Sequence, residues 1–496
     1  MAAEAPPKST AQPSAGRLDA AFLNAARALV GDGAVLVEPE AIAPFLIETR
    51  GLHHGHAEAV FCPRETAEVA ALMRLAHGHR VPVVAIGGNT GLVGGAVPFG
   101  GILISLAKLN RVRAVDAANA TITVEAGVVL QLVQQAAREA GFLFPLSLAS
   151  EGSCTIGGNI STNAGGTAVL RYGNTRDLVL GIEAVLPDGQ IFNGLGALRK
   201  DNAGYDLKHL FIGSEGTLGI VTAAVLKLYP APKSRVTAFV GAPSPGEVVA
   251  LFERLRGMAG ESLSTFEILP RFGLDIVLRH APNTRDPLAG RHAWYGLIEM
   301  TSPEADAPLE GVLMAVLEAA LEAGEIEDAT LAASEAQAGD FWRLREQLSE
   351  CQRFEGGSIK HDVSVPISRI ADFTAEITAA CEAALPGVRV CAFGHIGDGN
   401  LHFNISQPPG MEKAAFLAEW HRFNTLVHDG VAARGGSIAA EHGVGLNKRD
   451  ELVRYKDPVA LALMARIKQA IDPENLLNPG KVVRIGEALP MFKPGA

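Results

Sequence analysis

Apolar positions recur with two different periods along the first half of the chain. Helical spacing occurs at residues 18–31, 65–79 and 129–140. Shorter apolar runs typical of strands occur at 81–86, 102–106, 120–128, 178–187 and 219–228. The alternation predicts a domain of mixed strands and helices that ends near Pro230 and Pro232.

The pattern changes after residue 233. Long helices rich in alanine and leucine are predicted at 247–258, 308–323, 368–384 and 411–433. They alternate with strands such as 294–300 and 388–396, which predicts an α+β domain with its helices on one face of a sheet. A last segment contains one short predicted helix at 458–470.

Four units follow from this pattern, and a length of 496 residues agrees with about three folded domains. They are a disordered tail at 1–17, a first domain at 18–231, a second domain at 232–437, and a C-terminal segment at 438–496 that we expect to complete the functional site.

Charge and cysteine content narrow the classes of function. The net charge of −11 argues against a nucleic-acid partner, because phosphate binding needs a basic surface. Five cysteines without a C-x-x-C pair indicate free thiols in a reducing compartment and not a disulfide framework. No signal peptide, transit peptide or membrane span is recognisable, so we expect a cytoplasmic protein.

The 54 glycines gather in short runs, which indicates that backbone approaches a ligand closely. The first run, at 87–95, follows a predicted strand, where successive N–H groups can converge on a phosphate. A tight turn between strands would give the same pattern. A second run at 151–166 mixes glycine with small hydroxyl residues, and a third lies at 211–220. Several such segments in one domain favour a long dinucleotide lying between them.

A predicted hairpin brings two histidines together. Asp398-Gly399 between two strand-like runs is a strong hairpin signal. With these two residues as the turn, His395 and His402 lie directly opposite each other, and Asn404 points to the same face. Such a histidine pair is either a packing pair or a pair that shares one divalent ion.

Another turn offers a carboxylate to this pair. Glu441 stands beside His442 in a glycine-flanked segment. Two histidines and one carboxylate with an open position form a pattern typical of catalytic zinc.

Three more side chains are candidates for anion binding. Arg345 and Ser349 are four residues apart in a predicted helix at 341–350 and would share a face. Lys360 precedes a strand-like run at 363–366. Solvated surface charges would give the same pattern.

Four segments together carry a resemblance to a known family. They read GGNTGLVGG, GSCTIGGNISTNAGG, RKDNAGYDLKHL and FIGSEGTLGI. Over about residues 30–482 the chain resembles the FAD-dependent D-2-hydroxy-acid dehydrogenases of the vanillyl-alcohol-oxidase and p-cresol-methylhydroxylase superfamily. The resemblance implies an α+β fold, with a two-subdomain FAD-binding domain and an antiparallel-sheet substrate domain flanked by helices.

The resemblance also implies a set of FAD contacts. FAD is expected to be non-covalent, because the first glycine run contains no histidine. The contacts would come from Gly87, Gly88, Asn89, Thr90, Gly91, Leu92, Ser153, Thr155, Gly158, Asn159, Thr162 and Ile220.

The roles of the remaining candidates follow from the same resemblance. A divalent metal, expected to be zinc, would be bound by His395, His402 and Glu441. The substrate carboxylates would be bound by Arg345, Ser349, Lys360 and Asn404, and the general base would be His442. Ser349 stands where the family is expected to have threonine, a change that keeps the hydroxyl.

These roles imply oxidation of a small D-2-hydroxy acid to the 2-oxo acid. The metal would lower the pKa of the 2-hydroxyl, His442 would remove its proton, and the hydride would pass to flavin N5. Two cations beside a metal favour a dicarboxylate, with D-2-hydroxyglutarate preferred over D-malate.

Other functions remain open at this point. They are a D-lactate or glycolate dehydrogenase of the same fold, a metal-dependent hydrolase, and a non-catalytic flavoprotein electron-transfer subunit. We expect an electron-transfer flavoprotein or a quinone as electron acceptor, no nucleic-acid partner, and a homodimer as one candidate oligomeric state.

Overall fold

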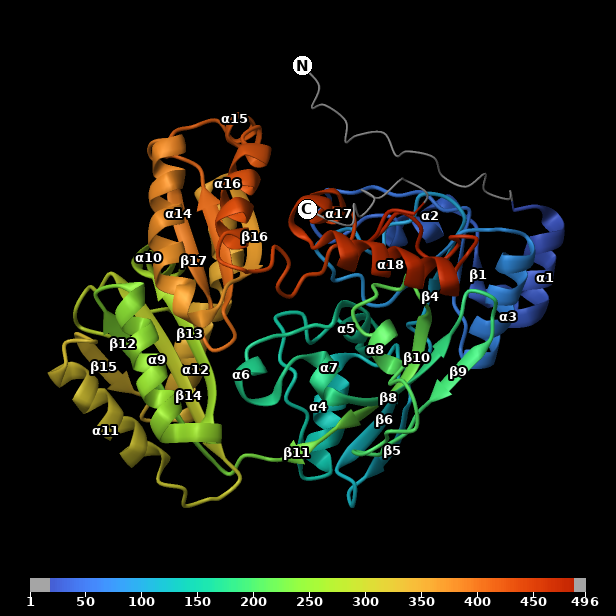
Figure 1. Ribbon diagram of the computed structural model, residues 1–496. Helices are drawn as coiled ribbons and strands as arrows, with labels where there is room; N and C mark the ends of the chain where they lie inside the picture. Colours follow the sequence, from blue (N-terminus) through green and yellow to red (C-terminus); the bar gives the residue numbers. More distant parts are fainter. Residues whose placement is uncertain (1–17, 486–496) are drawn as a thin grey trace, which may run out of the picture.

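The chain folds into two lobes that lie side by side (Figure 1). The computed structural model describes residues 18–485, so the predicted tail at 1–17 and residues 486–496 lie outside the described residues. The first lobe contains small sheets and carries the C-terminal helices, and the second lobe is built on one large sheet. The predicted α+β fold is confirmed.

Two main sheets form the first lobe, as the two-subdomain prediction requires. The smaller one contains, in spatial order, β1 (Val35–Leu36), β2 (Ala59–Phe61), β4 (Ile102–Ser105) and β3 (Val83–Ile86). The larger one contains β5 (Val112–Asp116), β6 (Thr121–Glu125), β10 (Ile220–Lys227), β8 (Val179–Val185) and β9 (Ile191–Gly194). A short pair of β7 (Phe142–Leu143) and β11 (Tyr229–Pro230) lies where the lobe ends.

Eight helices of the described chain precede the second lobe. They are α1 (Ala20–Val30), α2 (Pro39–Ile42), α3 (Thr66–Gly78), α4 (Leu130–Glu139), α5 (Ile156–Thr162), α6 (Val169–Tyr172), α7 (Thr175–Leu178) and α8 (Lys208–Phe211). α1 illustrates how the sequence sets the ends of a helix. It begins after Asp19, whose carboxylate accepts a hydrogen bond from the Phe22 N–H at 2.8 Å, and it ends at Gly31 with φ of 82°.

The second lobe is built on a seven-stranded sheet in which every pair of neighbours is antiparallel. Its spatial order is β15 (Asp328–Leu331), β12 (Ser234–Ala242), β14 (Trp294–Ser302), β13 (Leu263–Pro270), β17 (Arg389–His395), β18 (Asn400–Ser406) and β16 (Ser358–Ser364).

One face of this sheet is apolar and covered by long helices. They are α9 (Pro245–Ala259), α11 (Leu309–Glu322), α14 (Ile370–Ala384) and α16 (Trp420–Ala432). Leu251 of α9, Phe373 of α14 and Phe423 of α16 are fully buried in the same core cluster as Ile268 and Phe403 of the sheet.

The opposite face divides into two halves, and the prediction of helices on one face only was wrong. Around Phe239 and Leu297 this face is apolar and is covered by α10 (Arg271–His280), α12 (Glu335–Glu346) and α13 (Leu348–Cys351). These helices are amphipathic enough to bury Leu274 and Phe341 there. Toward β17, β18 and β16 the same face becomes polar.

Two predicted helices are each broken in the structure. The segment predicted at 411–433 divides into α15 (Lys413–Leu417) and α16, because the Glu419 N–H bonds the Phe416 carbonyl in an i→i−3 pattern at 3.0 Å. The segment predicted at 341–350 divides at Gln347.

The C-terminal segment returns to the first lobe, where α17 (Arg449–Tyr455) and α18 (Pro458–Ile471) lie (Figure 1). The buried Lys468 ammonium donates to the carbonyls of Thr217 and Leu477, both at 2.8 Å, and to the Asp472 carboxylate at 2.5 Å. The buried charge of Lys468 is stabilised because each hydrogen of the ammonium has an acceptor. The first lobe is therefore completed by residues from the end of the chain.

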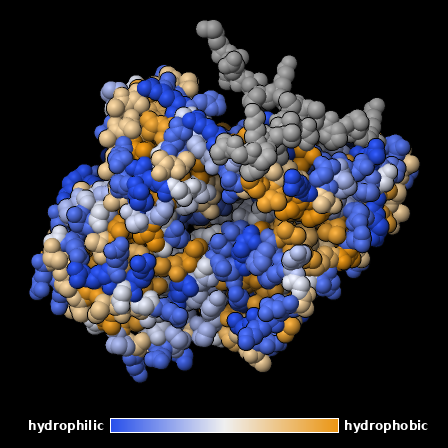
Figure 2. Space-filling view, viewed as in Figure 1, coloured by the Kyte–Doolittle hydropathy of each residue, from blue (hydrophilic) through white to orange (hydrophobic). Residues whose placement is uncertain are grey.

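Apolar side chains on the outer surface occur as separate patches among polar ones on the face seen in Figure 2. Between residues 18 and 485, no helix is both long and apolar enough to span a bilayer.

Candidate flavin and metal sites

A cavity of about 710 Å³ lies in the first lobe, and it is lined by the glycine-rich segments. All of the residues expected to contact FAD line this cavity: Gly87, Gly88, Asn89, Thr90, Gly91, Leu92, Ser153, Thr155, Gly158, Asn159, Thr162 and Ile220. Glu441 and His442 line it as well, so the metal-site turn and the cofactor cavity adjoin.

Glycine is required where the first two runs touch. A Cβ atom at Gly87 would lie 2.3 Å from Thr155 Oγ1, and one at Gly88 would lie 2.1 Å from the Ser153 carbonyl oxygen. Both distances are far below van der Waals contact, so a side chain at either position would separate the loops. The glycine runs thus hold two backbones against each other as well as lining the cavity.

Two buried polar atoms along the cavity lack hydrogen-bond partners within the described chain, and a bound dinucleotide could supply them. Thr155 Oγ1 and Asn159 Nδ2 are buried, and neither has a hydrogen-bond partner among residues 18–485. Buried polar groups are rarely left unpaired. The hydroxyls of Ser153 and Thr162 donate to the carbonyls of Ser150 at 3.2 Å and Gly158 at 3.1 Å. The residues present therefore fit FAD, with Thr155 and Asn159 as its free polar contacts.

The first glycine run is held from outside by a segment that sequence reasoning missed. The Asn89 amide donates to the Ile47 carbonyl at 2.9 Å, and the Thr49 hydroxyl donates to the Asn89 carbonyl at 2.7 Å. The Arg50 guanidinium donates to the Leu92 carbonyl. Asn89 has φ of 53°, a left-handed conformation that asparagine tolerates better than most residues.

The histidine hairpin has a different register from the predicted one. Residues 396–399 all belong to the turn, His395 pairs with Asn400, and His402 pairs with Phe393. The two-residue turn fails because only Gly399 has positive φ, at 79°, whereas a type I′ turn needs it at Asp398 too. His395 and His402 are still on one face, as diagonal neighbours with ring centroids 5.8 Å apart.

Glu441 meets both histidines. Its Oε1 atom lies 3.1 Å from His395 Nε2 and 3.9 Å from His402 Nε2, and the three ligand atoms lie within 4.8 Å of one another. This Oε1 is buried and, among the described residues, accepts no well-aligned hydrogen bond. A carboxylate oxygen that faces two ring nitrogens at these distances is an arrangement that suits a shared cation. The three residues therefore fit a divalent metal.

Glu267, which sequence reasoning missed, lies behind this cluster. It is fully buried on β13, accepts from Arg345 Nε at 2.5 Å with one oxygen and contacts His395 Nδ1 with the other. Burial opposes its charge, but Arg345 and His395 lower its pKa to about 2. With Nδ1 engaged, His395 presents Nε2 to Glu441. A lone Glu in the apolar run 263–270 was the signal available in the sequence.

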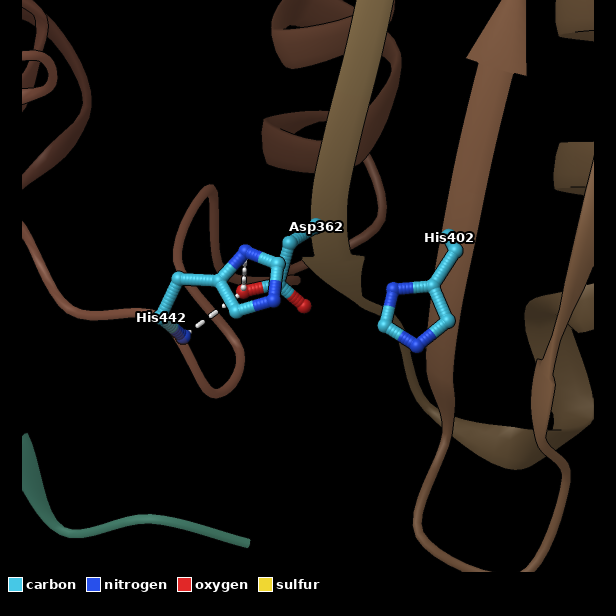
Figure 3. Close-up of side chains that lie close together, drawn as sticks. All are labelled: Asp362, His402 and His442. Carbon is cyan, nitrogen blue, oxygen red and sulfur yellow. Dashed lines mark hydrogen bonds and ion pairs between the residues drawn. The ribbon is translucent and has the colours of Figure 1, made fainter. Parts of the chain in front are cut away.

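Asp362 is a second missed carboxylate, and it lies opposite His402 on β16. His442 approaches the same carboxylate from the other side, with Nδ1 at 3.4 Å from Asp362 Oδ2 (Figure 3). Burial opposes the charge of Asp362, but His442, Lys448 and His402 hold its pKa well below its usual range. Asp362, His402 and His442 form a second group whose ligand atoms lie within 4.8 Å.

The candidate substrate anchors occupy the polar half of the sheet face. Lys360 lies opposite Asn404, two pairs along from Asp362 and His402, so all four side chains point the same way. The Lys360 ammonium donates to the Ser349 carbonyl at 3.3 Å, and burial lowers its pKa. The Asn404 amide donates to Gln352 Oε1 at 2.9 Å.

Arg345 and Ser349 do not share a helix face, which contradicts the prediction. Arg345 lies in the last turn of α12 and is buried over the Phe393 ring, with its Cζ 4.8 Å from the ring centroid. Ser349 lies on α13 and is exposed. The chain bends at Gln347 because Leu348 turns inward into the core. Arg345 is also paired with Glu267, so it is not the solvated charge that its pattern would equally allow.

Fold and site together define a class of protein, the FAD-linked oxidases. Residues 57–194 match the FAD binding domain family, and residues 231–482 match the family described as FAD linked oxidases, C-terminal domain. More particularly, the chain belongs to the D-2-hydroxyglutarate dehydrogenase family and is an FAD-dependent 2-hydroxy-acid dehydrogenase.

Its relatives extend over almost the whole chain. It is 39% identical to the mitochondrial D-2-hydroxyglutarate dehydrogenase of Bos taurus, over 91% of this chain and 81% of the relative. It is 40% identical to the D-2-hydroxyglutarate dehydrogenase of Xanthomonas citri pv. viticola, over 87% and 90%. A D-2-hydroxyglutarate–pyruvate transhydrogenase of Saccharomyces cerevisiae is 34% identical, over 97% and 98%. Because some relatives are named as mitochondrial and others are not, the cytoplasmic location stays a prediction.

Solved structures agree on the fold. Substrate-bound p-cresol methylhydroxylase superposes with a TM-score of 0.73 at 19% identity, covering 93% of this chain and 96% of that one. An alkyldihydroxyacetonephosphate synthase gives 0.70 at 17% identity, covering 94% and 86%. At these identities the likeness concerns the fold alone.

Proposed function

We propose that this enzyme oxidises a D-2-hydroxy dicarboxylate, with D-2-hydroxyglutarate preferred over D-malate, at a metal site beside the flavin. The observation that carries the proposal is the cluster of His395, His402 and Glu441, in which Glu441 and the adjacent His442 line the FAD cavity. The names of the bovine and Xanthomonas relatives support the substrate.

Two cationic side chains on the same sheet face support a dicarboxylate. Arg345 contacts Glu267 through Nε, and among residues 18–485 its two terminal nitrogens have no other hydrogen-bond partner. Within the described part of the chain, the Lys360 ammonium has one acceptor, the Ser349 carbonyl. A guanidinium and an ammonium with unused donors can bind a second carboxylate, whereas D-lactate or glycolate would leave one of them unpaired. Asn404 and Ser349 flank them.

The groups that the protein would bind supply part of the chemistry. FAD, when bound, accepts a hydride from the substrate carbon. A divalent ion, for which zinc is our first candidate, lowers the pKa of an alcohol that it binds. The chain contributes the ligands, the cationic anchors and the proton acceptor.

His442 is the proposed proton acceptor for the substrate hydroxyl. It lines the cavity and is half-buried, and Nδ1 is its nitrogen nearer to Asp362. Its Nε2 has no hydrogen-bond partner among the described residues, so this nitrogen can take a proton. A positioned imidazole is the side chain that most often serves as a general base.

Anaerobic mixing with a substrate panel tests this function. D-2-hydroxyglutarate, D-malate, D-lactate and glycolate are each added to the metal-loaded holoenzyme, and bleaching of the flavin band is followed. We expect the two dicarboxylates to reduce the flavin fastest. H442A should retain FAD and metal yet reduce flavin at least about 100-fold more slowly. Near-normal reduction by H442A would contradict the base, and fastest reduction by D-lactate or glycolate would contradict the substrate class.

A further inference from the structure

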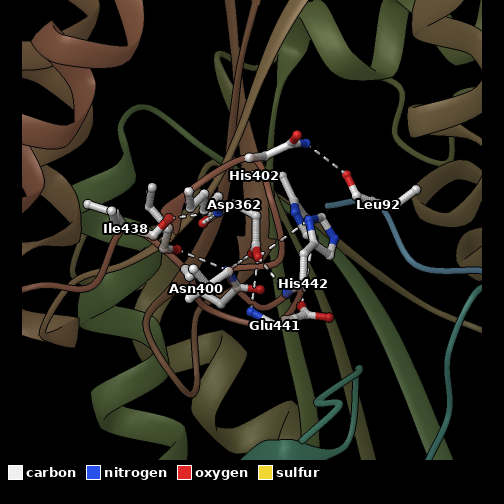
Figure 4. Close-up of polar contacts among 12 residues, drawn as sticks. Leu92, Asp362, Asn400, His402, Ile438, Glu441 and His442 are labelled. Atoms are coloured by element: carbon white, nitrogen blue, oxygen red, sulfur yellow. Dashed lines mark hydrogen bonds and ion pairs between the residues drawn. The ribbon is translucent and has the colours of Figure 1, made fainter. Parts of the chain in front are cut away.

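The turn that carries Glu441 and His442 is held by two buried carboxylates, one from each lobe. Glu215 of the first lobe accepts from the N–H groups of Val444 at 2.7 Å and Gly445 at 2.8 Å. Asp362 of the second lobe accepts through Oδ2 from the N–H groups of Glu441 at 3.0 Å and His442 at 2.9 Å (Figure 4). Of the four N–H groups of this short turn, two therefore donate to a carboxylate of the first lobe and two to a carboxylate of the second lobe.

Asp362 is the contact that relates this turn to the metal-ligand hairpin. It is 3% exposed and stands directly opposite His402 in the sheet. Its other oxygen, Oδ1, accepts from the Asn400 amide at 3.0 Å, and Asn400 pairs with His395. The Asp362 carboxylate is therefore held by Asn400 of the hairpin as well as by the turn. Its position is set by β16 and β18.

The His442 ring completes the contacts of Asp362. Nδ1 lies 3.4 Å from Asp362 Oδ2, and the ring is stacked at 20° on His402 with centroids 6.0 Å apart (Figure 3). One carboxylate oxygen therefore holds both the backbone N–H and the ring of the same histidine, which fixes how the ring faces the cavity. Orienting partners of this kind set the geometry of a histidine.

We infer that Asp362 is the positioning residue for His442: it orients the imidazole toward the substrate hydroxyl without touching the substrate or the metal. The inference rests on the proposed function, in which His442 is the base. The alternative is that Asp362, His402 and His442 themselves bind an ion. We favour positioning because Asp362 Oδ2 already accepts two backbone hydrogen bonds, whose positive hydrogens would face such an ion.

A double-mutant cycle tests this role on the FAD- and metal-loaded enzyme. D362N, H442A and the double variant are compared by the rate of flavin reduction at saturating D-2-hydroxyglutarate, by KM, and by metal content. We expect D362N to slow reduction by about 10- to 100-fold in the wild-type background and by less than about twofold in the H442A background. KM should change less than about threefold and metal content should be retained.

Each other result has a defined meaning. Equal losses in both backgrounds would show that Asp362 only supports the turn, and loss of metal from D362N would make it a ligand. Either result overturns the positioning role while leaving the proposed function intact. Normal reduction by H442A alone would overturn the proposed function and this inference together.

Two further variants guard against misfolding and nonspecific effects. N400A removes the amide that fixes Asp362 Oδ1, and it is the variant to use if D362N releases FAD. Its loss should be smaller and should also vanish in the H442A background, and a loss that persists there contradicts the inference. E299Q is the matched control, because Glu299 is a carboxylate of the same sheet that accepts from Trp342 Nε1 at 3.0 Å, and it should reduce flavin at the wild-type rate within about twofold.

Discussion

Glu267 shows how one buried carboxylate can serve two functional side chains. It binds Arg345 with one oxygen and His395 with the other, and it is itself inaccessible to solvent. Removing its charge leaves His395 without the partner that fixes its ring, while Arg345 loses its only ion pair among residues 18–485.

E267Q should therefore weaken metal binding by about 10- to 100-fold, because the His395 ring is no longer held. The measurement is metal content after titration with a chelator, with flavin absorbance to show that FAD is retained. E299Q again serves as the control, and an unchanged metal affinity in E267Q would show that Glu267 has no part in the site.

A substitution of Lys360 tests the proposed substrate selectivity most directly. The stem of Lys360 is largely buried, so methionine can replace it with little change of packing. K360M should lower kcat/KM for D-2-hydroxyglutarate by about tenfold or more, since a charged hydrogen bond is lost. The value for D-lactate should change less than about threefold. Equal losses for both substrates would remove Lys360 from the carboxylate site.

At the scale of elements, an ion cluster around the largely buried Glu355 carboxylate joins a helix end, a short 3₁₀ turn and a strand. Glu355 ends the 3₁₀ turn Gln352–Glu355 and accepts from Arg279 of α10 at 2.5 Å, His280 of α10 at 2.8 Å and Arg389 of β17 at 2.5 Å. Burial opposes its charge, but His280, Arg389 and Arg279 lower its pKa to about 2. The folded pKa is thus below the unfolded value of about 4.3.

Because the pKa of Glu355 is lower in the folded state, the free energy of unfolding depends on pH. The stabilisation by Glu355 is fully present above about pH 4.3 and is lost as the pH falls toward about 2. E355Q should lower the free energy of unfolding by about 1–3 kcal/mol at pH 7, and the difference from wild type should shrink below about pH 4.3. All three tryptophans, at 294, 342 and 420, lie in the second lobe, so their fluorescence in urea measures this effect. A difference that does not depend on pH would contradict the assignment.

The hairpin shows what an element-scale rule can and cannot decide. Asp398-Gly399 correctly indicated a turn, and the alternation of the strands put both histidines on one face. The register depended on two more residues joining the turn, which moved His395 opposite Asn400. Local turn signals do not decide this, because the sheet neighbours β13 and β16 also constrain where pairing begins.

At the scale of the whole molecule, the turn that carries Glu441 and His442 depends on contacts between segments far apart in sequence. Glu215 holds Val444 and Gly445, and the Leu446 N–H donates to the Val93 carbonyl of the first glycine run at 2.8 Å. The cofactor cavity and the turn that carries His442 therefore share one support.

E215A should loosen this support and lower the temperature at which FAD is released by about 5 °C or more, because two buried N–H groups lose their acceptor. Flavin fluorescence during heating measures the release. E474Q, a change at a more exposed carboxylate that pairs with Arg80, is the control and should release FAD at the wild-type temperature. An unchanged release temperature in E215A would mean that the turn does not support FAD binding.

The sequence by itself determined the elements and the chemistry of this protein. Helix and strand periods are local, so α1, α3, β3 and β10 could be predicted within a few residues, and glycine runs with small hydroxyl residues indicated a dinucleotide site, which the family resemblance made specific for FAD. The histidine pair and the carboxylate of the candidate metal cluster could be named from the sequence, and the same resemblance proposed them as ligands. Only the tertiary structure decided which buried carboxylates support that cluster. Glu267, Asp362 and Glu215 lie far in sequence from the residues they hold, and long-range hydrogen bonds leave no periodic trace in the chain.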